Sequence, residues 1–241
     1  MNESHLKYPR GVLLDLDDTI LSISARVNHC WSEVGARFSE RSGGGVTADN
    51  LLSAIDEVRT WYWNDTERHR LGRLNLDRAR QEVVEMALVR LGIHDHRLAV
   101  DLADSYGKEI EKYTRPFPGA IDALKRFREK NVLLALVTNG SVESQRRKIR
   151  RFELEPFFDS IIIEGEFGCG KPDERVFRHA LSQLNVDEKD AWMIGDDLDR
   201  DIVGSQQLGI FSIWVDWQNK GLPELATVRP DRIISSIAEL I

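Results

Sequence analysis

The sequence predicts an α/β protein with a Rossmann-like, doubly wound parallel sheet and an inserted α-helical domain. Three short apolar runs end abruptly in polar residues, and helical periodicity lies between the later runs. Short apolar runs bounded by turn residues are typical of strands buried on both faces. Alternating strands and helices at this spacing favour a parallel sheet with right-handed crossovers. A long stretch with helical patterns alone, placed after the first run, indicates the inserted domain.

Six apolar runs are predicted as strands of this sheet. The first run ends at Asp15, the second at Thr138, and a later one at Gly195. Because ligands bind at the carboxyl ends of parallel strands, we expect these three polar ends to share one functional edge. In chain order, the predicted strands are residues 12–14, 132–137, 161–163, 191–194, 211–215 and 232–234.

Helices are predicted between the strands because apolar residues recur there at helical spacing. Positions 120, 121, 123, 124 and 127 share one face, and positions 176, 177, 180, 181 and 184 share another. Asp173, which follows Pro172, is the expected N-cap of the second of these helices.

Residues 21–115 contain no convincing buried strand and are predicted as a domain of about four helices. The glycines at 43–45, 72 and 92 are expected to break these helices, and the Pro-Phe-Pro-Gly segment at 116–119 is expected to form a stiff connector. The predicted core domain therefore comprises residues 1–20 and 116–241, and the helical domain comprises residues 21–115.

Composition excludes several classes of protein. The chain has 241 residues, with 33 Lys and Arg against 40 Asp and Glu, so its net charge of −7 disfavours nucleic acid and anionic membranes as partners. No run approaches the roughly 20 apolar residues of a membrane span, and residues 1–10 lack the apolar stretch of a signal peptide. Two cysteines, Cys30 and Cys169, are expected to be reduced thiols. We therefore expect a cytoplasmic protein.

The first strand ends in an acidic motif, Asp15-Leu16-Asp17-Asp18-Thr19. Three carboxylates so close together repel one another, and a divalent cation is the simplest compensation. An acidic turn or helix cap is the alternative, although one or two aspartates would suffice for either.

A second acidic cluster follows the predicted strand at 191–194. It contains Asp196, Asp197, Asp199 and Asp201, which exceeds what capping a helix N-terminus requires. Two acidic strand ends on one sheet edge are able to surround a hard cation with oxygens. Mg²⁺ suits such a site because it binds through a few carboxylates, waters and substrate phosphate.

Two further segments supply groups that suit phosphate. Thr138-Asn139-Gly140 offers a hydroxyl, an amide and backbone N–H groups at a helix start, and Lys171 lies in a loop before a helix. Taken alone, the first is an ordinary N-cap and the second an exposed loop lysine.

Together, these segments resemble the four motifs of the haloacid dehalogenase superfamily, specifically its phosphatase branch with a helical type 1 cap. Members are mostly Mg²⁺-dependent phosphohydrolases, and the helical insert sits where this branch carries its cap. The matching residues are Asp15, Asp17 and Thr19 for the first motif, Thr138-Asn139-Gly140 for the second, Lys171-Pro172-Asp173 for the third, and Gly195-Asp196 with Asp201 for the fourth.

The resemblance implies a role for each matching residue. Asp15 would be the nucleophile that forms an aspartyl-phosphate, and Asp17 the general acid and base. Mg²⁺ would be held by the carboxylates of Asp15 and Asp196 and by the backbone carbonyl of Asp17. The phosphoryl oxygens would be steadied by the residues Thr138, Asn139 and Lys171. Lys171 or metal-bound water would be oriented by Asp197 and Asp201, and the site would be supported from behind by Thr19.

The implied activity is hydrolysis of a small phosphate monoester, namely a sugar phosphate, a sugar-acid phosphate or a nucleotide. The expected partner is a small phosphorylated metabolite, and the protein is expected to be a monomer or homodimer. The alternatives are a non-catalytic, phospho-regulated or binding protein of the same fold, a haloacid dehalogenase or a phosphomutase. Dehalogenases lack an acid at the position of Asp17, and phosphomutases usually need a cap lysine, whereas residues 20–107 contain none.

Arginines are concentrated in part of the helical insert. Five lie between positions 66 and 80, and this composition resembles the caps of sugar-acid phosphatases. Arg68, Arg70 and Arg73 are candidates for reading the group attached to the phosphate. The alternative is that these arginines form a solvated face and the neighbouring tryptophans pack within the domain.

Overall fold

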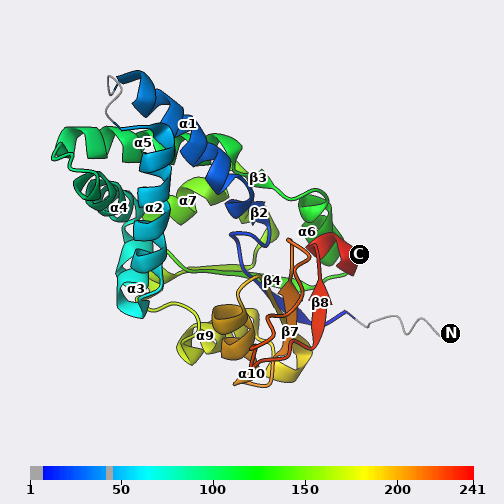
Figure 1. Ribbon diagram of the computed structural model, residues 1–241. Coiled ribbons are helices and arrows are strands. Elements are labelled where there is room, and N and C mark those ends of the chain that lie inside the picture. Colours follow the sequence, from blue (N-terminus) through cyan, green and yellow to red (C-terminus); the bar gives the residue numbers. More distant parts are fainter. Residues whose placement is uncertain (1–7, 42–45) are drawn as a thin grey trace. The chain divides into compact units, whose positions relative to one another are not determined.

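A computed structural model describes residues 8–41 and 46–241, and the chain divides into two compact units (Figure 1). The core unit comprises Met1–Ser22 and Arg115–Ile241, and the helical unit comprises Ile23–Thr114. The predicted break at 43–45 falls on residues outside the described ranges. Within those ranges, no helix has the length and apolar character needed to cross a bilayer.

The core unit contains a six-stranded sheet in which every neighbouring pair is parallel, in the order β5-β4-β1-β6-β7-β8. The predicted α/β fold class is therefore confirmed. The strands are β1 (Gly11–Leu14), β4 (Leu133–Thr138), β5 (Ser160–Ile163), β6 (Ala191–Gly195), β7 (Phe211–Val215) and β8 (Arg232–Ile234).

Strand β1 lies between β4 and β6, and this placement organises the functional edge. Leu14 pairs with Leu136 of β4 and with Ile194 of β6. The backbone N–H of Asp15 then donates to the carbonyl of Ile194 over 2.9 Å. The residue that follows β1 is thus held by the ladder itself, beside the ends of both neighbouring strands.

Helix α9 shows how the sheet is covered. Its N-cap is Asp173, as predicted, and its apolar face is fully buried. Leu13, Ala135 and Met193 of three adjacent strands belong to the same buried cluster as this face. The helical segments of the core unit, α9 included, are α6 (Ala120–Glu129), α7 (Val142–Arg151), η2 (Glu155–Phe157), α8 (Glu164–Phe167), α9 (Glu174–Leu184), η3 (Glu188–Asp190), η4 (Leu198–Val203), α10 (Gly204–Gln206) and η5 (Ile237–Leu240).

A short antiparallel pair marks where the chain leaves and re-enters the core unit. In it, β2 (Leu21–Ser22) pairs with β3 (Arg115–Pro116), with Ser22 opposite Arg115. The predicted stiff connector begins in β3 and ends at Gly119, whose φ of 77° lies in the left-handed region.

The described part of the helical unit has five α-helices rather than about four. Asn64 caps the end of one helix, Asp65 begins the next, and Asn75 separates that helix from the following one. The side chains of Asp65 and Asn75 each accept a hydrogen bond from a backbone N–H in the first turn of the next helix, so these residues start new helices where no glycine is present. The helices are α1 (Val27–Arg41), α2 (Ala48–Trp63), α3 (Thr66–Leu74), α4 (Leu76–Arg90) and α5 (His96–Tyr113), preceded by η1 (Ser24–Arg26).

The predicted helix break at Gly72 is wrong, because this glycine lies inside α3. A Cβ at this position would lie 2.9 Å from Tyr62 and 3.0 Å from Trp63. Gly72 is therefore needed because it lets α3 pack closely against the aromatic end of α2. It keeps a helical backbone and does not form a turn.

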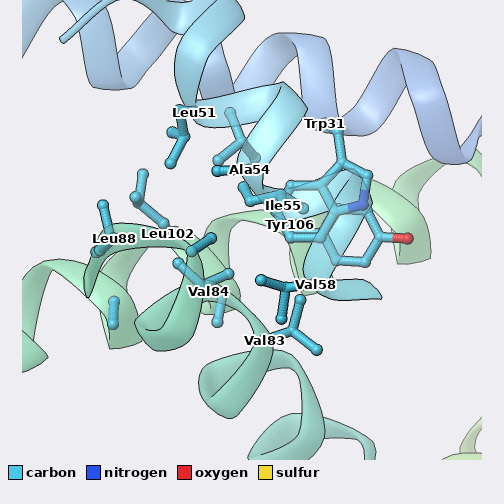
Figure 2. Close-up of a cluster of buried hydrophobic side chains, with 14 of the residues drawn as sticks. Trp31, Leu51, Ala54, Ile55, Val58, Val83, Val84, Leu88, Leu102 and Tyr106 are labelled. Carbon is cyan, nitrogen blue, oxygen red and sulfur yellow. The ribbon is translucent and has the colours of Figure 1, made fainter. Parts of the chain in front are cut away.

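The helical unit has its own apolar core (Figure 2). Side chains of α2, α4 and α5 meet there, among them Ile55, Val84 and Leu102. At one side the ring of Trp31 stacks on Tyr106, with centroids 3.9 Å apart and planes 12° apart. Because one face of each helix is buried in this core, the helical periodicity of apolar residues is enough to predict a helical domain from the sequence.

Candidate active site

The ends of β1 and β6, the segment η4 after β6 and one loop place four predicted site residues together. The Nζ atom of Lys171 lies 2.6 Å from Oδ1 of Asp15 and 2.6 Å from Oδ1 of Asp201. Lys171 is only 2% exposed and Asp15 7%, so this is a buried ion triad. Oxygens of Asp15, Asp196 and Asp201 lie within 4.8 Å of one another.

Gly195 makes the approach of Asp201 possible. A Cβ at Gly195 would overlap the carboxylate of Asp201. Oδ2 of that carboxylate also accepts a hydrogen bond of 3.1 Å from the backbone N–H of Asp197. The loop after β6 therefore folds back on its own start. The fourth motif requires glycine at position 195 because any side chain there would clash with Asp201.

Asn139 holds the backbone of Lys171 by two hydrogen bonds. Its Nδ2 donates to the Lys171 carbonyl and its Oδ1 accepts from the Lys171 N–H, each over 2.8 Å. The Asn139 side chain is thus committed to positioning the lysine, which leaves its backbone as the predicted phosphate contact. The N–H of Gly140, in contrast, donates to Oε2 of buried Glu164 over 2.9 Å. Glu164 was not anticipated from the sequence.

The carboxylate of Asp17 faces a different set of groups. Lys148 Nζ lies 2.7 Å from Oδ1 and 2.5 Å from Oδ2 of Asp17. Gln145 Nε2 donates to Asp17 Oδ2 over 3.1 Å and to Thr138 Oγ1 over 2.6 Å. Both residues come from α7, and neither was predicted from the sequence as a site residue.

The sequence of α7, the helix that follows β4, contains a pattern from which Gln145 could have been predicted as a site residue. Gln145 and Ile149 stand four residues apart and are both buried, so they share the inward face of α7. An amide on the buried face of a helix needs polar partners. Since α7 starts directly after Thr138-Asn139-Gly140, those partners had to lie at the functional edge.

Burial and mutual repulsion raise the pKa values of the acidic groups. Removal from water raises the pKa of Asp15 to about 7, with Lys171 opposing the change, and that of Asp196 to about 9, with the charge on Asp15 adding to it. The pKa of Asp201 is also raised, mainly by burial. Burial alone would lower the pKa of Lys171, but the charges of Asp15 and Asp201 raise it well above its usual value.

This donor set fits a hard divalent cation. Three carboxylates converge, and one lysine contacts two of them. The pKa of Asp196 is raised to about 9, so a positive charge nearby would favour the ionised form of this carboxyl group. The predicted ligands are the carboxylates of Asp15 and Asp196 and the backbone carbonyl of Asp17. The cluster of carboxylates in the structure consists of Asp15, Asp196 and Asp201. Oxygen ligands of this kind are those that Mg²⁺ prefers.

The raised pKa of Asp196 predicts an unusual pH dependence for the stability of the metal-free protein. Between about pH 4 and pH 9, the folded state keeps a proton on Asp196 that the unfolded state has released. The free energy of unfolding is therefore expected to fall as the pH rises through this window. Thermal unfolding in chelator at pH 5, 6.5 and 8 measures it, and Mg²⁺ is expected to raise the melting temperature most at pH 8.

The matched control for this prediction is Asp196→Asn, which cannot titrate at that position. This variant is expected to show a shallower decline of melting temperature with pH and a smaller response to Mg²⁺. An unchanged pH slope in Asp196→Asn would contradict the assignment.

Two residues predicted to support the site have other surroundings. The carboxylate of Asp197 accepts hydrogen bonds from the N–H groups of Asp199 and Arg200, 3.0 and 2.7 Å away, and forms an ion pair with the Arg200 side chain. It therefore caps η4, which differs from its predicted role of orienting Lys171. Thr19 is 1% exposed, and its hydroxyl has no hydrogen-bond partner among the described residues.

The three candidate specificity arginines have local contacts within the helical unit. Arg68 lies 3.8 Å above the ring of Trp61 and donates to the Trp61 carbonyl over 3.0 Å. Arg70 donates to Glu67 over 2.7 and 2.9 Å, and Arg73 Nη1 lies 3.2 Å from a ring nitrogen of His69. These contacts support packing roles, which is the alternative considered above.

Comparison with known proteins identifies the family of the chain. The model of the haloacid dehalogenase-like hydrolase family matches residues 9–209. N-acylneuraminate-9-phosphatase of Rattus norvegicus is 35% identical over 248 residues, which cover 96% of this chain and 92% of that protein. Phosphoserine phosphatase of Thermus thermophilus is 35% identical over 162 residues, but the match spans 67% of this chain and only 63% of that protein.

A solved structure confirms the fold. The magnesium-bound HAD hydrolase YfnB of Bacillus subtilis superposes with a TM-score of 0.72, covering 97% of both chains at 24% identity. The chain belongs to the haloacid dehalogenase-like hydrolase family. The resemblance stated from its motifs is therefore confirmed, as is the prediction of an enzyme of the phosphoric monoester hydrolase type.

Proposed function

We propose that the protein is a Mg²⁺-dependent phosphatase that hydrolyses a small phosphate monoester through an aspartyl-phosphate on Asp15. The observation that carries this proposal is the buried triad of Lys171 with Asp15 and Asp201, beside the carboxylate of Asp196. An ionised lysine in contact with the proposed nucleophile is where a phosphate dianion would find positive charge.

Each residue then has a defined part in the reaction. Asp15 Oδ attacks phosphorus, and the bond between phosphorus and the leaving oxygen breaks. The carboxyl group of Asp17 gives its proton to that oxygen and then takes a proton from the water that attacks the aspartyl-phosphate, which releases phosphate and restores Asp15. Lys171 and Thr138 contact the phosphoryl oxygens.

Mg²⁺ would be held by the carboxylates of Asp15 and Asp196 and by the backbone carbonyl of Asp17, and when bound it would supply positive charge that offsets the repulsion between carboxylate and phosphate. Asp201 completes the carboxylate cluster in the structure and gives Lys171 a second anionic contact, at 2.6 Å. The lysine is thereby kept charged in a buried setting.

The substrate we favour is a phosphorylated sugar acid, with sugar phosphates and nucleotides as the other members of the class. The match of N-acylneuraminate-9-phosphatase along nearly the whole chain supports a small phosphorylated metabolite. The arginines of α3 make local contacts in the structure, and their proposed contact with substrate is tested below. Arginine binds carboxylates in a bidentate geometry, which suits an acidic sugar.

Phosphate release by metal-stripped protein tests the proposed function. The panel comprises p-nitrophenyl phosphate, phosphoserine, N-acylneuraminate 9-phosphate, sugar phosphates and nucleoside monophosphates, each with and without Mg²⁺. We expect turnover of p-nitrophenyl phosphate that requires Mg²⁺, and higher kcat/KM on a sugar-acid phosphate. Absence of turnover across the panel with Mg²⁺ present would instead support a non-catalytic binding protein of this fold.

Alanine variants of Arg68, Arg70 and Arg73 test the proposed reading of the leaving group. If these arginines contact that group, each variant keeps its turnover of p-nitrophenyl phosphate and loses about tenfold in kcat/KM on the preferred metabolite, about 1.4 kcal/mol of binding. Arg90, which forms an exposed pair with Glu57 in the same unit, is the matched control. An equal loss on all substrates with a lower melting temperature would show that the arginines only stabilise the helical unit.

A further inference from the structure

We propose that Lys148 and Gln145 of α7 are positioning residues that hold the side chain of Asp17 in place for its two proton transfers, from the carboxyl group to the leaving oxygen and from the attacking water back to the carboxylate. The inference rests on the proposed function, in which Asp17 is the general acid and base. It adds two residues that lie outside the four motifs of the sequence analysis. All four side chains concerned, including Thr138, belong to the core unit.

Lys148 contacts both oxygens of Asp17, at 2.7 and 2.5 Å. The lysine side chain is 17% exposed and that of Asp17 is 35% exposed. An aspartate this open to water, on a loop beyond a strand end, has several rotamers available to it. A charged donor that bridges both carboxylate oxygens restricts the side chain to one of them, at a smaller entropic cost when the reaction begins.

Gln145 connects Asp17 to the phosphate-binding side of the site. Its Nε2 lies 3.1 Å from Asp17 Oδ2, 2.6 Å from Thr138 Oγ1 and 2.8 Å from the Asn139 carbonyl. Since Gln145 is buried, these acceptors are its available partners. The amide therefore couples the orientation of Asp17 to that of the hydroxyl that contacts the phosphoryl group.

The helix places these two side chains by its geometry. Ser141 caps α7 by accepting a hydrogen bond from the N–H of Ser144 over 3.3 Å. Gln145 and Lys148 stand three residues apart and so lie on one face, with Ile149 anchoring the same side. A helix anchored at its start and on its inner face is a rigid support for a catalytic carboxylate.

The core unit thus assigns separate lysines to the two catalytic carboxylates. Lys171 contacts Asp15, the proposed nucleophile, whereas Lys148 contacts Asp17, the proposed proton donor. A lysine that only binds phosphate would affect all substrates equally. Loss of a lysine that positions the proton donor lowers kcat/KM most for substrates whose leaving group needs a proton most.

The experiment compares kcat/KM of Lys148→Met on p-nitrophenyl phosphate, phenyl phosphate and β-glycerol phosphate. The p-nitrophenolate ion departs without a proton, while phenolate and especially an alkoxide benefit from one. General acid catalysis contributes on the order of 10²–10⁴ to such reactions. We expect Lys148→Met to lose about 10- to 100-fold on β-glycerol phosphate, less on phenyl phosphate, and less than about threefold on p-nitrophenyl phosphate.

Further variants isolate the effect. Lys148→Arg keeps a bidentate cation and is expected to restore the ratio of the three kcat/KM values. Arg146→Met is the matched control, because Arg146 lies on the same helix and forms a bidentate ion pair with Glu166, at 2.7 Å for each bond. Arg146→Met is expected to leave the ratio unchanged. In an Asp17→Asn background, Lys148→Met is expected to cause no additional leaving-group dependence.

The outcomes separate the inference from the proposed function. A wild-type protein that hydrolyses none of the three esters would defeat the proposed function itself. An active wild type with an equal loss on all three esters in Lys148→Met would overturn the inference and assign Lys148 to phosphate binding. If Lys148→Met melts at a lower temperature, Lys148→Gln, which retains one donor, takes its place and is expected to give an intermediate ratio.

Discussion

Asp15→Asn is expected to abolish phosphate release, with a loss of at least about 10⁴-fold in kcat. An amide oxygen is too weak a nucleophile to form the aspartyl-phosphate, and no other described carboxylate occupies its place at the end of β1. The substitution preserves the shape of the side chain, and its backbone hydrogen bond to Ile194 is kept. Continuous measurement of phosphate release from p-nitrophenyl phosphate with Mg²⁺ checks this expectation.

Asp199→Asn is the matched control for Asp15→Asn. It removes an exposed carboxylate from the second acidic cluster and is expected to retain wild-type turnover. Both variants are expected to fold, which thermal unfolding verifies. Retained turnover in purified Asp15→Asn would show that a different group forms the covalent bond, or that none does.

Lys171→Met is expected to lower both stability and activity. Removal of the lysine leaves Asp15 and Asp201 buried without the cation that lies 2.6 Å from each. Breaking a buried ion pair in this way costs about 3–5 kcal/mol, because the remaining charge is uncompensated. For a chain of this size, this corresponds to a melting temperature about 6–20 °C lower in chelator. Mg²⁺ is expected to recover part of that loss by supplying positive charge to the same carboxylates.

Lys125→Met provides the comparison for Lys171→Met. Lys125 pairs with Asp122 over 3.3 Å, but both side chains are more than half exposed. Water screens such a pair, so its loss is expected to change stability by less than about 1 kcal/mol. Equal melting temperatures for the two methionine variants would contradict the assignment of a buried triad.

The parts of the fold that the sequence predicted best are those with strong local patterns. Buried parallel strands require unbroken apolar runs, and the runs ending at Asp15, Thr138 and Gly195 became β1, β4 and β6. The polar residue at the end of each run could be identified because it interrupts the apolar sequence. The helix boundaries of the insert were less visible, because Asn and Asp caps resemble ordinary surface residues.

The parts of the site that escaped prediction depend on contacts distant in sequence. Gln145 contacts Asp17, which lies 128 residues earlier, and Glu164 contacts Gly140, which lies 24 residues earlier, and both partners belong to motifs already identified. Lys148 lies among several basic residues on α7, so its charge alone carried no information. Asp197 caps η4, a contact that was not predicted, because a capping aspartate and an orienting aspartate look alike in sequence.

The pairing of β2 with β3 also bears on how the protein is assembled from modules. Ser22 and Arg115 are opposite one another in an antiparallel pair, so the chain leaves and re-enters the core unit at neighbouring points. Two antiparallel strands can be joined by a hairpin of two residues. The β2–β3 pair can therefore be connected by inserts of different lengths. Residues 23–114 can be exchanged in evolution while the catalytic groups of the proposed chemistry stay in the core unit.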